Sequence, residues 1–239
     1  MPPTSRFDMN EPLSPEQLEA LGQLDACTLA NAIETFHERL RNEGFMDNTV
    51  RCLFPRLQPM VGYAATVKIR GSMPPMGKDP YPQRTDWWDY VNTLPAPRVA
   101  VVQDVATRPG LGSLVGAVHV SILQALHCVG VITNGAVRDI PAADSAGFHY
   151  FAGNVAVSHA YVHVVETGTP VEVGGLKIRS GDLLHGDLHG VQSIPLNIAA
   201  QVPAVAAGIN ARTKELIAIC RAPDFSLERL RVAIAKKPF

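Results

Sequence analysis

The stretch Gly112–Asp139, GSLVGAVHVSILQALHCVGVITNGAVRD, decides the fold of this chain. It predicts a helix over Val115–Leu126, and the wholly apolar run Val129–Thr133 then predicts a buried strand. A helix joined by a short turn to a buried strand is typical of an α/β layer, in which helices cover the sheet. We therefore expect an α/β fold.

Two charged residues follow this strand, just after the turn residues Asn134 and Gly135. Arg138 and Asp139 place one fixed cation and one hard anionic ligand at the edge of the predicted sheet. In α/β folds that edge is where small anions and metals bind. A local salt bridge between neighbours is the other interpretation that the spacing allows.

Turn residues and periodicity predict further elements along the chain. Ser14-Pro15-Glu16-Gln17 has the N-cap serine, the proline and the early acid of a helix start. A second helix is predicted over Thr28–Arg41 by its apolar face, and Val61–Arg70 is predicted to be a strand. The other predictions are strands at 99–103, 149–151, 155–157, 162–166, 183–184 and 191–194, a Gly-Gly hairpin at 171–178, and helices at 140–146, 204–220 and 226–236.

Composition limits the class of protein. With 239 residues, 46% of them hydrophobic, the chain can bury a large core, and we expect a loose arm over 1–15 and one mixed α/β domain over 16–239.

A net charge of −1 gives no case for nucleic acid or a membrane surface, and no run approaches the ~18 apolar residues that span a bilayer. Four cysteines without CxxC spacing favour reduced, mostly buried thiols in a cytoplasmic protein.

The segment from Gly71 to Arg98 is rich in proline and aromatic residues. It either covers the site or forms a docking surface, and specificity is expected to depend on it. Trp87 and Trp88 either pack on their own domain, which is the preferred interpretation, or anchor a neighbouring subunit.

Several blocks in order give the chain a family resemblance. The blocks are LDACTLANAIE at 24–34, VGYAATV at 61–67, GAVRDI at 135–140 and PVEVGGLKIRSGDLLHGDLHGVQSIP at 170–195. The chain resembles the RraA-like family, which contains the class II 4-hydroxy-4-methyl-2-oxoglutarate aldolases and the regulators of ribonuclease E activity. The resemblance implies a single-domain ββα swivelling-type sandwich with mixed sheets and flanking helices. It also implies a homotrimer or homohexamer with active sites between subunits.

The resemblance implies a divalent metal, Mg²⁺ or Mn²⁺, coordinated by Asp139 and otherwise largely by water. It also implies that Arg138 holds the carboxylate or ketone of a pyruvyl group and the developing enolate. A metal chelated by the 2-oxo acid, with a guanidinium beside it, can stabilise the enolate without a Schiff-base lysine. Backbone N–H groups of Gly116-Ala117-Val118-His119, at a helix N-terminus, are expected to receive the carboxylate oxygens.

Three positions depart from the family pattern by lacking a carboxylate. Ala117 stands where family aldolases usually have an acid, Asn134 replaces the aspartate before the glycine of the DGxxRD block, and Asn31 replaces an aspartate of the N-terminal helix. The missing acid at Ala117 puts metal affinity or proton transfer in question. His119 is a candidate substitute base, the alternative being a packing or solvent-facing histidine. In the family an acid from the neighbour's C-terminal helix completes the site, and Glu215 is the residue available here.

Two histidine patterns have a structural alternative. His185, Asp187 and His189 form an HxDxH pattern that could bind a metal, but alternation along a strand and turn explains it as well. His159 and His163 could share a helix face, although their surroundings favour a strand.

The leading hypothesis is a metal-dependent carbon–carbon lyase, an aldolase or decarboxylase, that acts on a small 2-oxo acid. Its catalytic residues are predicted to be Arg138 and His119, and its metal ligand Asp139. The alternatives are a divergent family member with altered chemistry on another small acid, and a non-catalytic regulator that binds a protein. The residues predicted to bind the substrate are Arg138, Gly116, Ala117, Val118, His119 and Asn134.

Overall fold

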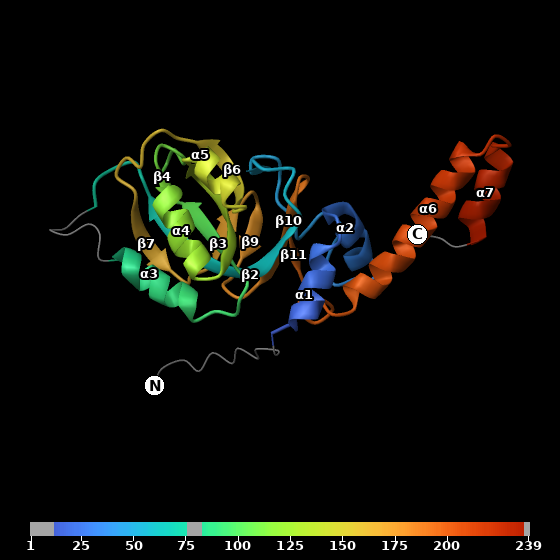
Figure 1. Ribbon diagram of the computed structural model, residues 1–239, viewed down its shortest axis with the longest axis horizontal. Coiled ribbons are helices and arrows are strands. Elements are labelled where there is room, and N and C mark those ends of the chain that lie inside the picture. Colours follow the sequence, from blue (N-terminus) through green and yellow to red (C-terminus); the bar gives the residue numbers. More distant parts are fainter. Residues whose placement is uncertain (1–11, 76–82, 237–239) are drawn as a thin grey trace.

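The computed structural model describes residues 12–75 and 83–236, so the predicted arm at 1–15 lies largely outside the described residues. A strongly curved mixed sheet with helices on one face forms the body, and a helical arm extends from it (Figure 1). The helices are α1 Pro15–Gly22, α2 Ala26–Glu34, α3 Gln83–Asn92, α4 Ala117–Ala125, α5 Ile140–Ser145, α6 Val202–Arg221 and α7 Leu227–Lys236.

The main sheet has nine strands, and seven of them follow the order β1-β6-β5-β3-β2-β10-β11. Its centre, β2-β3-β5-β6, is parallel, whereas β1, β7, β10 and β11 pair antiparallel. The strands are β1 Arg51–Cys52, β2 Met60–Arg70, β3 Arg98–Asp104, β4 Ser113–Val115, β5 Cys128–Val137, β6 His149–Val155, β7 His163–Thr167, β10 Leu183–Asp187 and β11 Gly190–Ile194. The predicted Gly-Gly hairpin is present as β8 Val171–Val173 and β9 Leu176–Ile178.

One segment connects both edges of the sheet and nearly closes it. Phe45 forms a bridge with Gln192 of β11, and the Met46 N–H donates to the Val191 carbonyl. A few residues later, β1 pairs with β6 at the opposite edge. Closure of this kind leaves few unpaired backbone groups at either edge.

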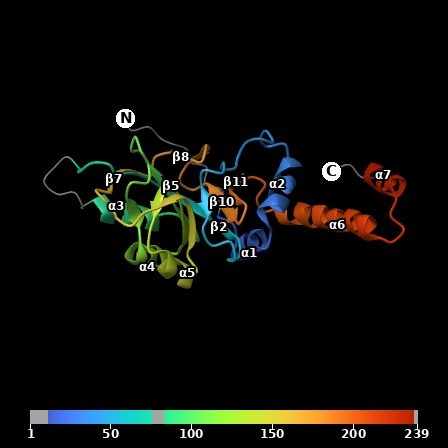
Figure 2. The same ribbon diagram turned by 90° about the horizontal axis from the view of Figure 1, so that it is seen from above.

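Alternate residues of the central strands enter two different cores. On β3, Val99 and Val101 face the inside of the curved sheet, while Ala100 and Val102 face the helices. Because both faces are buried, these strands are apolar runs rather than alternating patterns, as parallel sheets require. Each fully buried Val contributes about 1.5–3 kcal/mol. Helices α3, α4 and α5 cover the outer face (Figure 2).

The preferred interpretation of the tryptophans is confirmed for Trp87, which is fully buried in its own domain. Trp88 is half-buried, packs against the same core, and places its ring edge-on to His119 with centroids 6.0 Å apart. The predicted excursion is therefore in part the helix α3, which anchors on the sheet next to α4.

Local capping explains where the first two helices begin. Ser14 and Gln17 form the predicted capping box of α1. Helix α2 begins earlier than predicted because Asp25 accepts the Thr28 N–H. The predicted span Thr28–Arg41 is wrong at its end, since α2 stops at Glu34 and His37 adopts a left-handed conformation that a helix cannot continue.

Three further boundaries differ from the sequence predictions. The helix predicted from Val115 begins at Ala117, because residues 113–115 pair with β5 as the short strand β4. Strand β5 continues through Asn134 and Gly135 to Val137, and the two predicted strands at 149–151 and 155–157 are mainly one, β6. Pairing between β5 and β6 resumes at Ala136 after an irregularity, so the expected break is a bulge within the sheet.

The prediction of mostly buried cysteines is wrong. All four are free, but Cys27 and Cys220 are exposed, Cys52 is half-buried, and Cys128 alone is buried. The exposed pair lies on helices, in the first turn of α2 and near the end of α6, where an apolar pattern does not distinguish the solvent side. Burial raises the pKa of Cys128 to about 12, so this thiol stays protonated.

The helices α6 and α7 form an arm, residues 202–236, that extends away from the sheet in both views (Figures 1 and 2). Its base packs on α1 and α2, where Val202 and Ala206 are buried. Beyond this base α6 is joined by α7, and apolar side chains on the arm remain exposed: Ile217, Phe225, Leu227, Val232 and Ile234. None of the helices in the described part of the chain combines the length and apolar character needed to cross a bilayer.

We expect acid to destabilise the fold through His149. This histidine of β6 is buried against Phe151, and burial lowers its pKa to about 4. The unfolded chain, with a pKa near 6.5, takes up the proton first, so stability is complete above about pH 6.5 and falls as pH approaches 4. Between pH 7 and pH 4.5, His149→Phe should lose about 2 kcal/mol less unfolding free energy than the wild type, measured by urea denaturation. Equal losses in both proteins would contradict this role.

Candidate functional site

The predicted site residues meet where β5 ends and α4 begins. Strand β4 runs parallel to β5 and pairs with it, which places Gly116 beside the end of β5. The Arg138 N–H donates to the Val115 carbonyl over 3.1 Å, fixing the two segments to each other. Arg138 and Asp139 are 35% and 42% exposed at the side chain, so they lie at an open surface and not in the core.

Asp139 has a backbone conformation that is uncommon for a residue with a side chain. Its φ of 55° and ψ of 44° lie in the left-handed region, and it precedes the first turn of α5. Its carboxylate Oδ2 accepts the Ala117 N–H at 2.8 Å and lies 3.8 Å from Arg138 Nε. Strained positions of this kind concentrate at functional sites, where surrounding contacts hold them.

Gly116 is required here by space and not by its torsion angles. A Cβ at this position would lie 2.6 Å from Asp139 Oδ2 and 2.8 Å from Arg138 Nε. Only glycine therefore permits both charged groups to lie against the start of α4.

The expected cradle of N–H groups is partly filled by the chain itself. The Ala117 N–H, which we expected to receive a substrate carboxylate, donates to Asp139 instead. Val118 is exposed in the same turn, and His119 is half-buried with its ring against Trp88. The geometry thus brings Gly116, Ala117, Arg138 and Asp139 together, and His119 follows two residues after Ala117 with its ring against Trp88.

The side chain of Asn134, which the sequence predicted to bind substrate, forms hydrogen bonds with the backbone of β3. Its side-chain oxygen accepts the Asp104 N–H at 2.7 Å, and its amide nitrogen donates to the Asp104 carbonyl at 3.1 Å. This pairing fastens β5 to the end of β3. The family aspartate that it replaces could not donate the second bond when ionised.

Two residues that sequence reasoning missed support the site. The buried carboxylate of Asp104 accepts the N–H groups of Ala106 and Gly110, which orders the loop leading to β4. The Tyr150 hydroxyl donates to the Arg138 carbonyl at 3.2 Å, and burial raises the pKa of Tyr150, so this hydroxyl remains a donor. An acid directly after an apolar strand is the signal that could have identified Asp104.

The residues present fit a hydrated divalent cation with few protein ligands. Asp139 Oδ2 is engaged by Ala117, which leaves Oδ1 of a half-exposed carboxylate for a cation. Across residues 12–75 and 83–236, no three His, Cys, Asp or Glu side chains gather as a ligand set. Mg²⁺ keeps several waters and commonly binds one or two carboxylates together with oxygens of its substrate, so a single carboxylate is compatible with it.

The HxDxH pattern has a structural explanation. His185 is buried, with Nε2 2.9 Å from the Leu24 carbonyl. Asp187 accepts the N–H groups of Ala26 and His189, at 2.8 Å each, and so holds the start of α2 against the β10–β11 hairpin.

The remaining candidates, His159, His163 and Glu215, belong to other elements than Arg138. His163 begins β7 and His159 lies in the preceding turn, so the two do not share a helix. Glu215 pairs with Arg212 at 2.8 Å on α6, whose principal contacts are with α1, α2 and α7. In its own chain Glu215 is therefore remote from the site.

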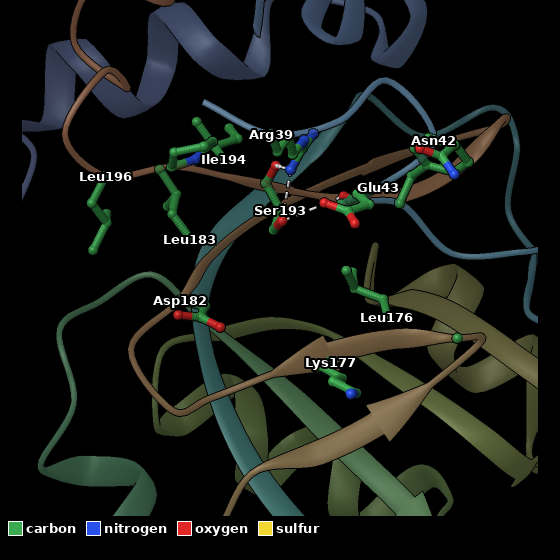
Figure 3. Close-up of a pocket in the computed structure, with 14 residues that line it drawn as sticks. Arg39, Asn42, Glu43, Leu176, Lys177, Asp182, Leu183, Ser193, Ile194 and Leu196 are labelled. Carbon is green, nitrogen blue, oxygen red and sulfur yellow. Dashed lines mark hydrogen bonds between the residues drawn. The ribbon is translucent and has the colours of Figure 1, made fainter. Parts of the chain in front are cut away.

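Cavities lie elsewhere in the described part of the chain. One of about 620 Å³ lies between the 39–45 segment and strands β9–β11, and Glu43, Ser193 and Asp182 line it (Figure 3). Burial raises the pKa of Asp182. Another of about 350 Å³ lies between α2 and the base of α6. Arg138 and Asp139 lie at an open surface.

Known proteins share this architecture. An uncharacterized protein from Pseudomonas syringae pv. tomato has a similar structure, with a TM-score of 0.72 at 20% identity, covering 97% of this chain and 99% of that one. Streptomyces coelicolor RraAS2, described as an unusual member of the RNase ES inhibitor RraA protein family, aligns with a TM-score of 0.66 at 19% identity over 89% of this chain and all of that one. At these identities the similarity shows the fold, which agrees with the expected mixed α/β class.

Sequence similarity assigns the family. The sequence model of the RraA-like family, "Aldolase/RraA", matches residues 26–192, and the chain belongs to this family. A Halalkalibacterium halodurans protein named "Putative 4-hydroxy-4-methyl-2-oxoglutarate aldolase" is 31% identical over 84 residues, which are 35% of this chain and 40% of that protein. The match thus spans less than half of that relative's length.

We expect Gly116→Ala to impair the site while the fold persists. The added methyl would displace the Asp139 carboxylate or the Arg138 guanidinium, since both lie within 3 Å of its position. Turnover of the 2-oxo acid that the sequence analysis expects as substrate should fall about tenfold to 100-fold, because misplacement by an ångström can cost 100-fold. Gly22→Ala is the matched control, since its Cβ would meet Val61 at an ordinary 3.8 Å. Unchanged kcat/KM in the Gly116 variant would show that the close approach does not matter.

Proposed function

We propose that this chain is a carbon–carbon lyase that acts on a small 2-oxo acid at the surface formed by Arg138 and Asp139. The observation that carries the proposal is their joint placement at the carboxyl end of β5, against the N-terminus of α4. The Arg138 guanidinium is always charged and its side chain is 35% exposed, so it can bind an oxyanion. Membership of a family that includes aldolases supports this choice of reaction.

Cleavage leaves an electron pair that becomes a pyruvate enolate. With oxaloacetate the C3–C4 bond breaks, CO₂ leaves, and a proton then converts the enolate to pyruvate. With 4-hydroxy-4-methyl-2-oxoglutarate a base removes the proton of the C4 hydroxyl, the C3–C4 bond breaks, and two pyruvate molecules result. Arg138 is positioned to bind the carboxylate or the enolate oxygen in either case, because its guanidinium donates in a fixed planar geometry.

Asp139 would hold a divalent metal, Mg²⁺ or Mn²⁺, which when bound acts as a Lewis acid toward the 2-oxo group. His119 is the proposed proton carrier, because it lies in the first turn of α4, two residues beyond Ala117, and is half-buried beside Trp88. An imidazole can accept the hydroxyl proton in aldol cleavage and return a proton to the enolate.

We further propose that the site is completed by a second copy of the chain in a homotrimer or homohexamer. An exposed apolar rim lies around the site, since Val155 of β6 pairs with Val137 of β5 and the His159 carbonyl lies against Gly112. Its members are Leu111, Val118, Val155, Val157 and Tyr161. The arm offers a comparable apolar surface and carries Glu215 away from its own site. A monomeric mass in light scattering at micromolar concentration would rule this arrangement out.

Arg138→Ala should reduce pyruvate release from oxaloacetate and from 4-hydroxy-4-methyl-2-oxoglutarate by about 100-fold or more, because it removes the cation that faces the developing charge. The assay contains Mg²⁺ or Mn²⁺, and circular dichroism confirms the fold. Arg41→Ala is the control, since Arg41 forms a surface pair with Glu34 that contributes little.

Full activity in the Arg138 variant would refute the assignment of the site. Absence of turnover of both acids by the wild type would instead favour a divergent reaction on another small acid, or a protein-binding role like that stated for Streptomyces coelicolor RraAS2.

A further inference from the structure

We infer that a groove at the amino ends of the parallel strands binds an uncharged ring compound that carries a hydroxyl group. The groove has a volume of about 590 Å³ and lies between α1 and the first residues of β2, β5 and β6. Arg138 follows the opposite end of β5, and the length of this strand, at about 3.3 Å per residue, separates it from Cys128 by roughly 30 Å. The groove is thus apart from the proposed lyase site, and the inference does not rest on that proposal.

The groove contains a buried histidine whose ring has no hydrogen-bond partner in the described part of the chain. His149, the first residue of β6, lines the groove and is 8% exposed. Its Nδ1 is buried without a partner among residues 12–75 and 83–236, and Nε2 is the ring nitrogen that remains accessible. Burial lowers the pKa of His149 to about 4, so the ring is neutral at pH 7. The imidazole therefore keeps its hydrogen-bonding capacity for a ligand.

A hydroxyl group suits this histidine whichever of its ring nitrogens carries the proton. A neutral imidazole has one N–H donor and one acceptor nitrogen, and a hydroxyl can both accept and donate. A buried polar group without a partner is less stable than one that is paired. A ligand whose hydroxyl reaches the His149 ring therefore gains a hydrogen bond that an apolar group of the same shape cannot form.

The charges along the groove oppose an anion. The described residues that line it include one carboxylate, Glu19, and neither a lysine nor an arginine. Gln58 and Gln124 add uncharged amides at the exposed rim. A carboxylate ligand would give up water here without meeting a cation, so an uncharged molecule is favoured over the 2-oxo acids that suit Arg138.

The floor of the groove is apolar and suits a flat ring. Its buried members are Leu18, Met60, Val61 and Cys128. A Cβ at position 130 would lie 2.5 Å from Met60 Sδ and 2.7 Å from His149 Cβ, so Gly130 lets the thioether and the imidazole lie against the same point of β5. Thioethers make favourable contacts with aromatic rings, and buried apolar area adds to the affinity. The floor thus selects a ring, and His149 selects its hydroxyl.

Phenol is the probe for this groove, and the Met60 methyl group is the reporter. In protein isotopically labelled at the methionine methyl groups, Met60→Leu identifies the Met60 signal, which is then followed by NMR during titration. Phenol should shift this signal in a saturable manner, with an affinity about tenfold or more above that of benzoate, because the groove does not balance the charge of benzoate. Absence of a saturable shift with phenol, or an equal affinity for benzoate, would overturn the inference.

His149→Phe tests the hydrogen bond, with toluene as the ligand that lacks the hydroxyl. The ratio of phenol affinity to toluene affinity should fall about fivefold in this variant, because only phenol loses a hydrogen bond. Comparison of the two ligands removes any general effect of the substitution on the groove. An unchanged ratio would contradict the role of His149 and overturn the inference.

Gly22→Leu tests the location of the ligand. A Cβ on Gly22 would meet Val61 at 3.8 Å and the Pro59 carbonyl at 4.0 Å, both in the groove, so a leucine there enters the groove without a close contact. Phenol binding should be lost, whereas Gly208→Leu, whose Cβ on α6 would meet nothing within 4 Å, should leave it unchanged. Circular dichroism confirms the fold of both variants, and this pair decides if His149→Phe does not fold. Phenol binding that persists in Gly22→Leu would overturn the inference.

Discussion

The site depends on one constraint, the hydrogen bond from the Ala117 N–H to Asp139 Oδ2. A Cβ on Gly116 would lie too close to Oδ2 for this bond to form as it does. The bond ties the start of α4 to the end of β5 and holds Asp139 in the left-handed conformation. A carboxylate at a helix N-terminus is electrostatically favoured, which offsets the cost of that conformation. The same bond also determines which groups remain for a ligand.

Residues behind this bond make the surface rigid. Asn134 joins β5 to β3, Asp104 orders the loop that leads to β4, and the Tyr150 hydroxyl donates to the Arg138 carbonyl. Because these supporting bonds come from three neighbouring strands, they can hold the Arg138 guanidinium and the Asp139 carboxylate close together. The two charges then do not neutralise each other fully. In the proposed assembly, another subunit would cover the open side of this surface.

Local signals could be predicted from the sequence, whereas long-range pairing could not. The capping box at Ser14 and the Gly174-Gly175 turn depend on neighbouring residues, and both are present as expected. The end of α2, by contrast, depends on the left-handed conformation of His37, which no local signal announced. Asn134 lies 30 residues from its partner Asp104, and Asp139 lies 22 residues from Ala117, so neither bond leaves a local pattern.

Ala117 stands where family aldolases usually have an acid, and this distinguishes the chain within the proposed chemistry. Asp139 is then the acid beside the start of α4, and the proposed reaction depends more on the Arg138 charge. The most direct measurement of that account is a crystal structure of the protein soaked with oxalate and Mn²⁺. The account predicts oxalate within hydrogen-bonding distance of the Arg138 guanidinium, with Mn²⁺ between oxalate and Asp139 Oδ1. Oxalate bound elsewhere, for example beside Glu43 and Ser193 in the cavity of Figure 3, with Arg138 facing solvent alone, would contradict it.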